Sequence, residues 1–244
     1  MKPLAETDFT LEPGTPADLR ALAHLHYCTA TPAGTAFILR ARARLGTRTC
    51  GVLVVTYPVL NAPWRARAWP EHFAGPRCAH ADRAAAQRAA ARRANAFVRC
   101  IARVIIDPRE RGLCLAAALV RAYLARPLTP CTEALAAQGA IAPFFTAAGM
   151  RAIDSPPAQR DILLTRRLSR LGLSAEHLLS GLPGLDAPTH AALCAALRQW
   201  ARTSSATRAA AGAPLADLAH RAANALLAPR RIFVHESRAA QEAA

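Results

Sequence analysis

The segment from residue 111 to residue 116 has the composition of a turn that binds an anion. It is formed by Arg111, Gly112, Leu113, Cys114, Leu115 and Ala116. It lies between an apolar run that ends at Ile106 and a stretch with helical spacing of leucines, so it leads into the first turn of a helix. Backbone N–H groups there lack intrahelical partners and lie at the positive end of the helix dipole, which suits a phosphate or pyrophosphate. An ordinary turn into a helix is the alternative.

Two residues further along could take part in proton or acyl transfer. Glu133 is the carboxylate on the strand expected after that helix, where it could accept a proton through water. The alternative for Glu133 is a solvated or ion-paired residue. Cys131 shares its face by the alternation of a strand, and is either an acyl-accepting nucleophile or a small buried residue.

No metal site is expected from the spacing of histidine and cysteine. The seven cysteines are scattered and form no C-x-x-C pair, which favours reduced thiols. His24 and His26 lie two residues apart on an expected helix and therefore diverge. Cys78 and His80 have no second pair of ligand residues nearby in the sequence.

The elements that must position these residues alternate between strands and helices. Residues 97–106 alternate as a central strand would, with Val98, Cys100, Ala102, Val104 and Ile106 on one face, and Pro108 ends the run. A helix follows and ends before Pro127. The other expected elements of this region are helices at 16–27, 81–94 and 142–148, strands at 36–43, 49–57, 130–137 and 161–165, and an ordered loop at 58–79 that contains Asn61, Trp64 and Trp69.

The sequence changes character after residue 173. Residues 174–228 carry only helix-like spacing of leucine and alanine. A short strand is expected at 231–235, and an isolated strand needs a sheet to join. This favours a helical insertion into the preceding domain.

The stretch from Val104 to Ala116, together with residues 143–150 (Pro-Phe-Phe-Thr-Ala-Ala-Gly-Met), resembles the GNAT acetyltransferase superfamily. The resemblance covers residues 16–168. It implies an α/β (α+β) fold with a mixed, mainly antiparallel central sheet flanked by helices. The implied organisation is an acyl-CoA-binding domain at 1–168, a helical insertion or subdomain at 169–228, and a final strand with a tail at 229–244.

The resemblance also implies an activity, the transfer of an acetyl group from acetyl-CoA to an amine acceptor. Backbone groups of Val104, Ile105 and Ile106 would bind the pantetheine amides, and residues 111–116 would surround the pyrophosphate. Two positions depart from the family pattern: Cys114 replaces a glycine of the loop, and Phe145 replaces a tyrosine that protonates the thiolate in many members. Through residues 61–70 and 104–150 the chain is also similar to the acetyltransferase-like domain appended to ABC-type ATPases in some bacteria and phages.

The charge of the chain leaves a second class of function open. Its 31 basic and 16 acidic residues give a net charge of +15, which codon bias toward arginine explains in part. A non-catalytic module that binds nucleic acid or an ABC-type ATPase partner is therefore the alternative, with a basic run at Arg83, Arg88, Arg92, Arg93 and Arg99. The chain lacks a G-x-x-x-x-G-K motif and a long uncharged apolar run, so we expect a cytoplasmic protein that is neither an ATPase nor membrane-bound.

Overall fold

The contacts of the chain divide it into two compact units. Unit 1 comprises Met1–Asp154 and Arg231–Ala244, and unit 2 comprises Ser155–Arg230. The second unit therefore begins at Ser155 rather than at residue 169. The computed structural model describes residues 9–26, 32–44, 46–60, 62–74, 83–136, 143–154, 157–180, 182, 184–227 and 231–237.

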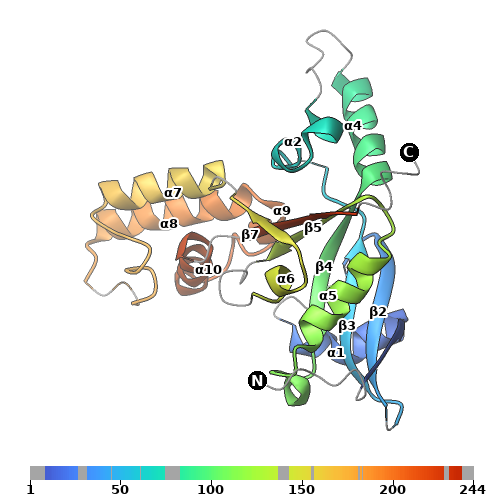
Figure 1. Cartoon of the computed structure of the whole chain (residues 1–244). Helices are drawn as coiled ribbons and strands as arrows, with labels where there is room; N and C mark the ends of the chain where they lie inside the picture. The colour runs from blue at the N-terminus through green and yellow to red at the C-terminus, as the bar shows by residue number, and fades with distance from the viewer. Residues whose placement is uncertain are drawn as a thin grey trace. The chain divides into compact units, whose positions relative to one another are not determined.

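Unit 1 contains a seven-stranded sheet in the order β1-β2-β3-β4-β5-β7-β6 (Figure 1). Only the β4–β5 pair is parallel among the pairings of the described residues. The mixed, mainly antiparallel sheet expected from the sequence is confirmed. Its strands are β1 (Phe9–Pro13), β2 (Thr35–Ala43), β3 (Thr49–Thr56), β4 (Val98–Ile106), β5 (Cys131–Ala136), β6 (Arg151–Ile153) and β7 (Arg231–Glu236).

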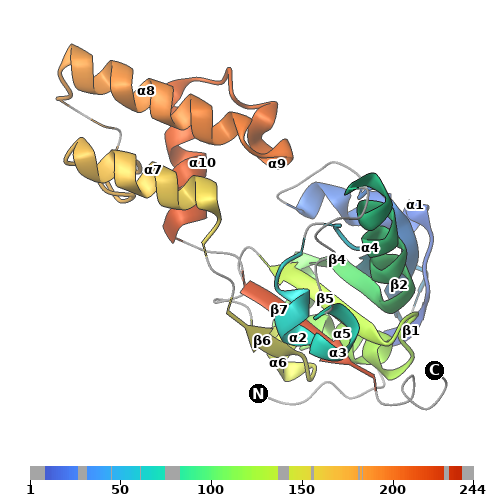
Figure 2. The same cartoon turned by 90° about the horizontal axis from the view of Figure 1, so that it is seen from above.

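Helices α1 (Pro16–Leu22) and α5 (Leu115–Ala125) cover opposite faces of the sheet (Figure 2). On one face Leu19 of α1 packs in a cluster with Val52 and Val54. On the other, α5 packs in a larger cluster that includes Leu53 and Val55. The apolar run of β3 is therefore buried on both sides, as expected for a central strand.

The helix predicted at 16–27 is shorter than expected and ends in a turn of 3-10 helix, η1 (Ala23–Leu25). Its start is confirmed. Thr15 accepts a hydrogen bond from the backbone N–H of Asp18, and the Asp18 carboxylate accepts one from the N–H of Thr15. This reciprocal pair satisfies two N–H groups at the helix start.

The segment predicted as a loop at 58–79 contains two short helices, so that prediction is wrong for part of it. They are α2 (Arg65–Ala68) and α3 (Pro70–Phe73). Pro70 occupies the first position of α3, where the missing proline N–H needs no partner. Trp69 is buried in a cluster with Val98, Cys131 and Val234, which anchors this segment on the sheet. The next helix, α4, spans Arg83–Phe97.

Unit 2 is helical, as the insertion predicted from the sequence requires. Its helices are α7 (Gln159–Arg170), α8 (Ala187–Arg202), α9 (Ser205–Arg208) and α10 (Leu215–Leu227). The strand predicted at 161–165 is wrong because these residues belong to α7. A short apolar run does not distinguish a strand from a helix. Leu164 and Leu168, one helical turn apart, pack in a cluster with Leu197 and Leu218.

None of the described helices is both long enough and apolar enough to cross a lipid bilayer.

Candidate functional site

Strands β4 and β5 pair at their beginnings and then separate. Their recorded pairs run from Val98 with Cys131 to Ile101 with Ala134, whereas β4 continues to Ile106. Within the described ranges, the β5-side edge of β4 therefore has no strand partner beyond Ile101. A free strand edge presents N–H and C=O groups that can pair with an extended ligand.

A β-bulge in β4 lies where the two strands separate. Val54 of β3 is opposite Arg103 and Val55 is opposite Ile101, so Ala102 is the additional residue. Ala102 is exposed although β4 is a central strand. The bulge reverses the alternation of β4, because one additional residue moves every later side chain to the other face.

The face predicted for residues 98–106 is therefore wrong in its second half. Val104 and Ile106 pack with Ile101 in the cluster beneath α5, and not on the face of Val98. Ile105 packs in the cluster beneath α1. These three residues of the predicted site, Val104, Ile105 and Ile106, lie in the part of β4 that extends beyond its pairing with β5. Backbone groups of alternate residues there face the free edge, because the others face β3.

A network of charged side chains supports the loop that follows β4. The Asp107 N–H donates to the Cys50 carbonyl at 2.8 Å. The Asp107 carboxylate accepts hydrogen bonds from the backbone and guanidinium of Arg109, and from Arg48 at 3.0 Å. The hydrogen bond from the Arg109 side chain, aided by its charge, holds the pKa of Asp107 well below the usual range of a carboxyl group.

The anion-binding turn predicted at 111–116 connects this loop to α5. A short 3-10 helix, η2 (Pro108–Glu110), precedes it, and residues 111–114 are exposed. Gly112 has φ +83°, and Cys114, the N-cap of α5, has φ +58°. The Cys114 side chain makes no capping hydrogen bond. The turn therefore leaves the first N–H groups of α5, from Leu115 onward, facing outward without a side-chain cap.

Glu133 lies beside the separation of β4 and β5, opposite Cys100. Its side chain is fully buried and its carboxylate accepts hydrogen bonds from Arg65 at 3.0 and 2.5 Å and from the Trp64 indole at 3.0 Å. The Arg65 side chain is only 3% exposed. The structure therefore shows Glu133 as an ion-paired residue, which was the alternative to a general base. The role of Glu133 as a general base stays a prediction.

Other residues singled out in the sequence are buried or lie elsewhere. Cys131 is buried, and burial, together with the charge of Glu236, raises its pKa to about 12, so its thiol is neutral at pH 7. Phe145, on α6 (Phe144–Ala147), stacks on Phe233 with ring centroids 5.0 Å apart. Asn61, Cys78 and His80 lie outside the described residues.

Sequence reasoning missed two features of this region, Arg65 and the bulge at Ala102. Arg65 lies among the tryptophans of the proline-rich segment, but no spacing relates it to a glutamate 68 positions later. The residue types keep alternating along the sequence through residues 98–106, so the sequence shows no sign of the bulge. Both features depend on the register of strands that are distant in sequence.

Solved structures that match part of the chain include two described as acetyltransferases. The chain matches a mosquito arylalkylamine N-acetyltransferase-like 5b (12% identity, TM-score 0.37) over 61% of its length and 86% of the mosquito chain. It matches a structure described as histone acetyltransferase HPA2 and related acetyltransferase from Corynebacterium glutamicum with 15% identity and a TM-score of 0.38. This match covers 63% of the present chain and 90% of the Corynebacterium chain. It matches SsHAT with 16% identity and a TM-score of 0.37, over 61% of the present chain and 94% of the SsHAT chain. No protein-family model and no curated protein sequence matches the chain. Identities and TM-scores this low do not transfer a function to this chain.

Proposed function

We propose that unit 1 is an N-acyltransferase that moves an acetyl group from acetyl-CoA to an amine. The observation that carries this proposal is the free edge of β4, which continues through an exposed turn into the uncapped start of α5. This places a row of strand amides and a helix N-terminus in succession along one short segment.

The two parts of the segment match two parts of coenzyme A. The pantetheine arm is extended and contains two amides, which can pair with backbone groups of Val104 to Ile106 as an added strand would. The pyrophosphate is anionic and fits the N–H groups at the start of α5. Arg111, exposed in the same turn, adds a positive charge beside them.

The chemistry requires little beyond orientation and polarisation of the thioester. The amine nitrogen attacks the carbonyl carbon, the C–S bond breaks, the acetyl group stays on nitrogen, and the nitrogen loses a proton. Holding the two reactants together and donating N–H groups to the carbonyl oxygen provide much of the acceleration. Phe145 has no proton to donate, but a thiol with a pKa of about 8.5 can leave as a thiolate.

Glu133 remains the predicted acceptor of the amine proton. Its hydrogen bonds with Arg65 would have to change for it to accept that proton. Both carboxylate oxygens accept hydrogen bonds from Arg65. Proton uptake would replace a charge-assisted pair with a neutral acid beside a buried guanidinium, which is unfavourable. A working base at Glu133 therefore requires the pair with Arg65 to open when the amine binds.

The proposal is tested by titrating the full chain with acetyl-CoA in a calorimeter and by measuring thiol release over a panel of amines. We expect saturable binding of acetyl-CoA, and release of free CoA that depends on an amine. Absence of binding at millimolar acetyl-CoA would refute the proposal. Binding without thiol release from any amine would reduce unit 1 to an acyl-CoA-binding module.

The alternative, a module that binds nucleic acid or an ATPase partner, has its own supporting observation. Helix α4 is exposed along most of its length, and Arg92 and Arg93 lie on it. Binding to DNA or RNA that weakens steeply with salt, and that is lost in an Arg92→Ala/Arg93→Ala variant, would favour this function over acyl transfer.

A further inference from the structure

Three residues with metal-binding side chains meet beside the first residue of β5. Cys131 begins β5, Glu236 ends β7, and the two are directly opposite in the antiparallel register. His72, on α3, approaches them from the segment that covers this face. One sulfur, one nitrogen and one oxygen of these side chains lie within 4.8 Å of one another, and the His72 Nε2 atom is 3.7 Å from a carboxylate oxygen of Glu236.

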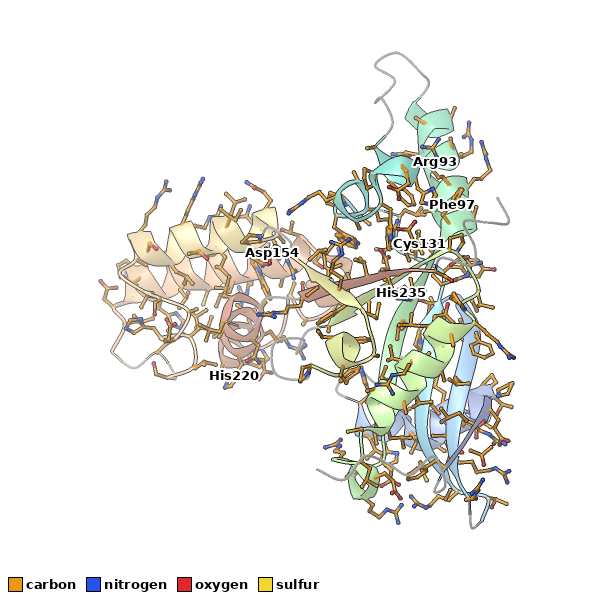
Figure 3. The ribbon with its side chains drawn as sticks, in the orientation of Figure 1. Arg93, Phe97, Cys131, Asp154, His220 and His235 are labelled. Carbon is orange, nitrogen blue, oxygen red and sulfur yellow. The ribbon has the colours of Figure 1, made fainter. Side chains whose placement is uncertain are left out.

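The orientation of the His72 ring points to a ligand. The ring stacks on Phe97 with centroids 4.6 Å apart, and the His72 carbonyl accepts a hydrogen bond from Arg93. Figure 3 labels Arg93, Phe97 and Cys131 in this region. Among the described residues, the buried Nε2 atom of His72 has no hydrogen-bond partner. The carboxylate oxygens of Glu236 and Glu71 lie near this atom but beyond hydrogen-bond distance. A buried nitrogen that makes no hydrogen bond is unfavourable, so a cation between it and the carboxylates would stabilise the fold.

We propose that His72, Cys131 and Glu236 bind a zinc ion, Zn²⁺. Imidazole nitrogen, thiolate sulfur and carboxylate oxygen are the ligands that Zn²⁺ takes in proteins, whereas Mg²⁺ and Ca²⁺ prefer oxygen alone. With bonds of about 2.0–2.3 Å to the metal, ligand atoms of a tetrahedral site lie about 3.3–3.6 Å apart. The three atoms, which lie within 4.8 Å of one another, must therefore move closer together by side-chain rotation when the metal binds.

The charges around the cluster also suit a divalent cation. Zn²⁺ displaces the proton of the Cys131 thiol to solvent, so thiolate and Glu236 together balance the charge of the metal. The carboxylate of Glu71 lies 3.9 Å from the same Nε2 atom of His72 and is half exposed. It provides an oxygen for the fourth position. A protein with only 16 acidic residues thus places two of them beside one buried thiol.

A metal at this point would join three segments of unit 1 that are distant in sequence. It would link α3 to the start of β5 and the end of β7. The segment held in this way also carries Trp64 and Arg65, the partners of Glu133. The zinc site itself does not depend on the proposed acyl transfer.

The test uses the full chain without a histidine tag, stripped with a chelator and titrated with Zn²⁺ against a chromophoric competitor. We expect one equivalent to bind tightly and to raise the thermal midpoint. Co²⁺ in place of Zn²⁺ should show sulfur-to-metal charge transfer in the near ultraviolet. His72→Gln and Glu236→Gln should each weaken Zn²⁺ binding by at least about tenfold. Cys131→Ser should abolish the charge-transfer band.

Helix α8 provides a matched control. Its Cys194 sulfur lies 3.8 Å from His190 Nδ1 on an exposed surface, so it offers two of the same ligand types in a different place. Cys194→Ser should leave the Zn²⁺ affinity unchanged. The proposal is overturned if the chain binds no stoichiometric Zn²⁺, or if His72→Gln and Glu236→Gln, at partly exposed positions, keep the parent affinity. Acetyl-CoA titrations of the same samples report on the acyltransferase proposal separately.

Discussion

Cys114 has a backbone conformation that disfavours its side chain. Its φ of +58° lies in the left-handed region, which is unfavourable by about 1–2 kcal/mol for a residue with a Cβ atom. A glycine would remove this strain but would also gain entropy in the unfolded chain. We therefore expect Cys114→Gly to raise the free energy of unfolding by about 0.5–1 kcal/mol, measured by urea denaturation, and to preserve or improve acetyl-CoA affinity.

Cys114→Ala is the control for this prediction. It removes the thiol but keeps the Cβ atom and the strain, so it should not stabilise the protein. A tenfold loss of acetyl-CoA affinity in Cys114→Gly, about 1.4 kcal/mol, would mean that the thiol itself contacts the ligand.

Gly112 is the second residue of this turn with a positive φ, +83°, and a Cβ atom added to it would meet no protein atom within 4 Å. A side chain at this position therefore projects into the space where the pyrophosphate is proposed to bind. We expect Gly112→Val to weaken acetyl-CoA binding in calorimetry by at least about tenfold while the chain stays folded.

Gly172 in unit 2 provides the matched control for Gly112. It has φ +69° and equally open surroundings, so Gly172→Val introduces similar backbone strain away from the turn. Its acetyl-CoA affinity should equal that of the parent chain. Equal affinities of the parent and Gly112→Val would show that the ligand does not approach this turn.

At the scale of elements, the Arg65–Glu133 pair connects α2 to β5. Both side chains are almost completely buried, so Glu133→Gln leaves a buried guanidinium without its charge partner. The expected loss in the free energy of unfolding is about 3–5 kcal/mol, measured by denaturant titration. If Glu133 also acts as the base, kcat falls by about 100-fold in the fraction that is folded.

An apolar replacement of both partners separates the two roles of Glu133. Arg65→Met/Glu133→Leu removes both charges together, and such exchanges are often neutral for stability. The double variant should therefore recover most of the lost stability. Full activity in this variant would exclude Glu133 as the base, whereas stability without activity would support it.

The loop between β4 and α5 should respond to acid through Asp107. Its folded-state pKa is lowered, first by the hydrogen bond from Arg109. A lowered pKa contributes stability above the unfolded value of about 3.9, and this contribution disappears as the pH falls toward the folded value. The difference in thermal midpoint between the parent and Asp107→Asn should be constant above about pH 5 and shrink below about pH 4. A difference that stays constant down to pH 3 would contradict this.

At the scale of the whole molecule, unit 2 is inserted between β6 and β7, and each unit has a hydrophobic cluster of its own. Ile153 of β6 is paired with Ile232 of β7. An Asn-Gly turn between Asp154 and Arg231 would therefore close a tight hairpin in place of residues 155–230. We expect the shortened chain to unfold cooperatively and to bind acetyl-CoA with unchanged affinity. An unfolded or aggregated product would show that unit 1 needs unit 2.

Much of the sheet and the position of the turn at residues 111–114 were predictable from the sequence because they depend on local signals. Each of these signals involves residues of a single helix or strand. They are the cap at Thr15, the apolar runs of β3 and β4, and the leucine spacing of α5. The helix α7 was missed because the short apolar run at 161–165 was considered alone. The longer segment carries a helical signal, since Leu164 and Leu168 lie one turn apart and both pack against α8 and α10.

The tertiary structure determines which side chains come together at the candidate sites. Ala102 becomes a bulge because of the register between β3 and β4, and this moves Val104 and Ile106 to the face of α5. Glu133 is visible in the sequence, but its partner Arg65 is not, because the chain brings them together only when α2 packs on β5. Sequence alone thus determined the positions of the strand β4 and the turn before α5, which we propose bind acyl-CoA. Only the packing of distant segments determined which side chains are buried together, because such contacts leave no periodic signal along the chain.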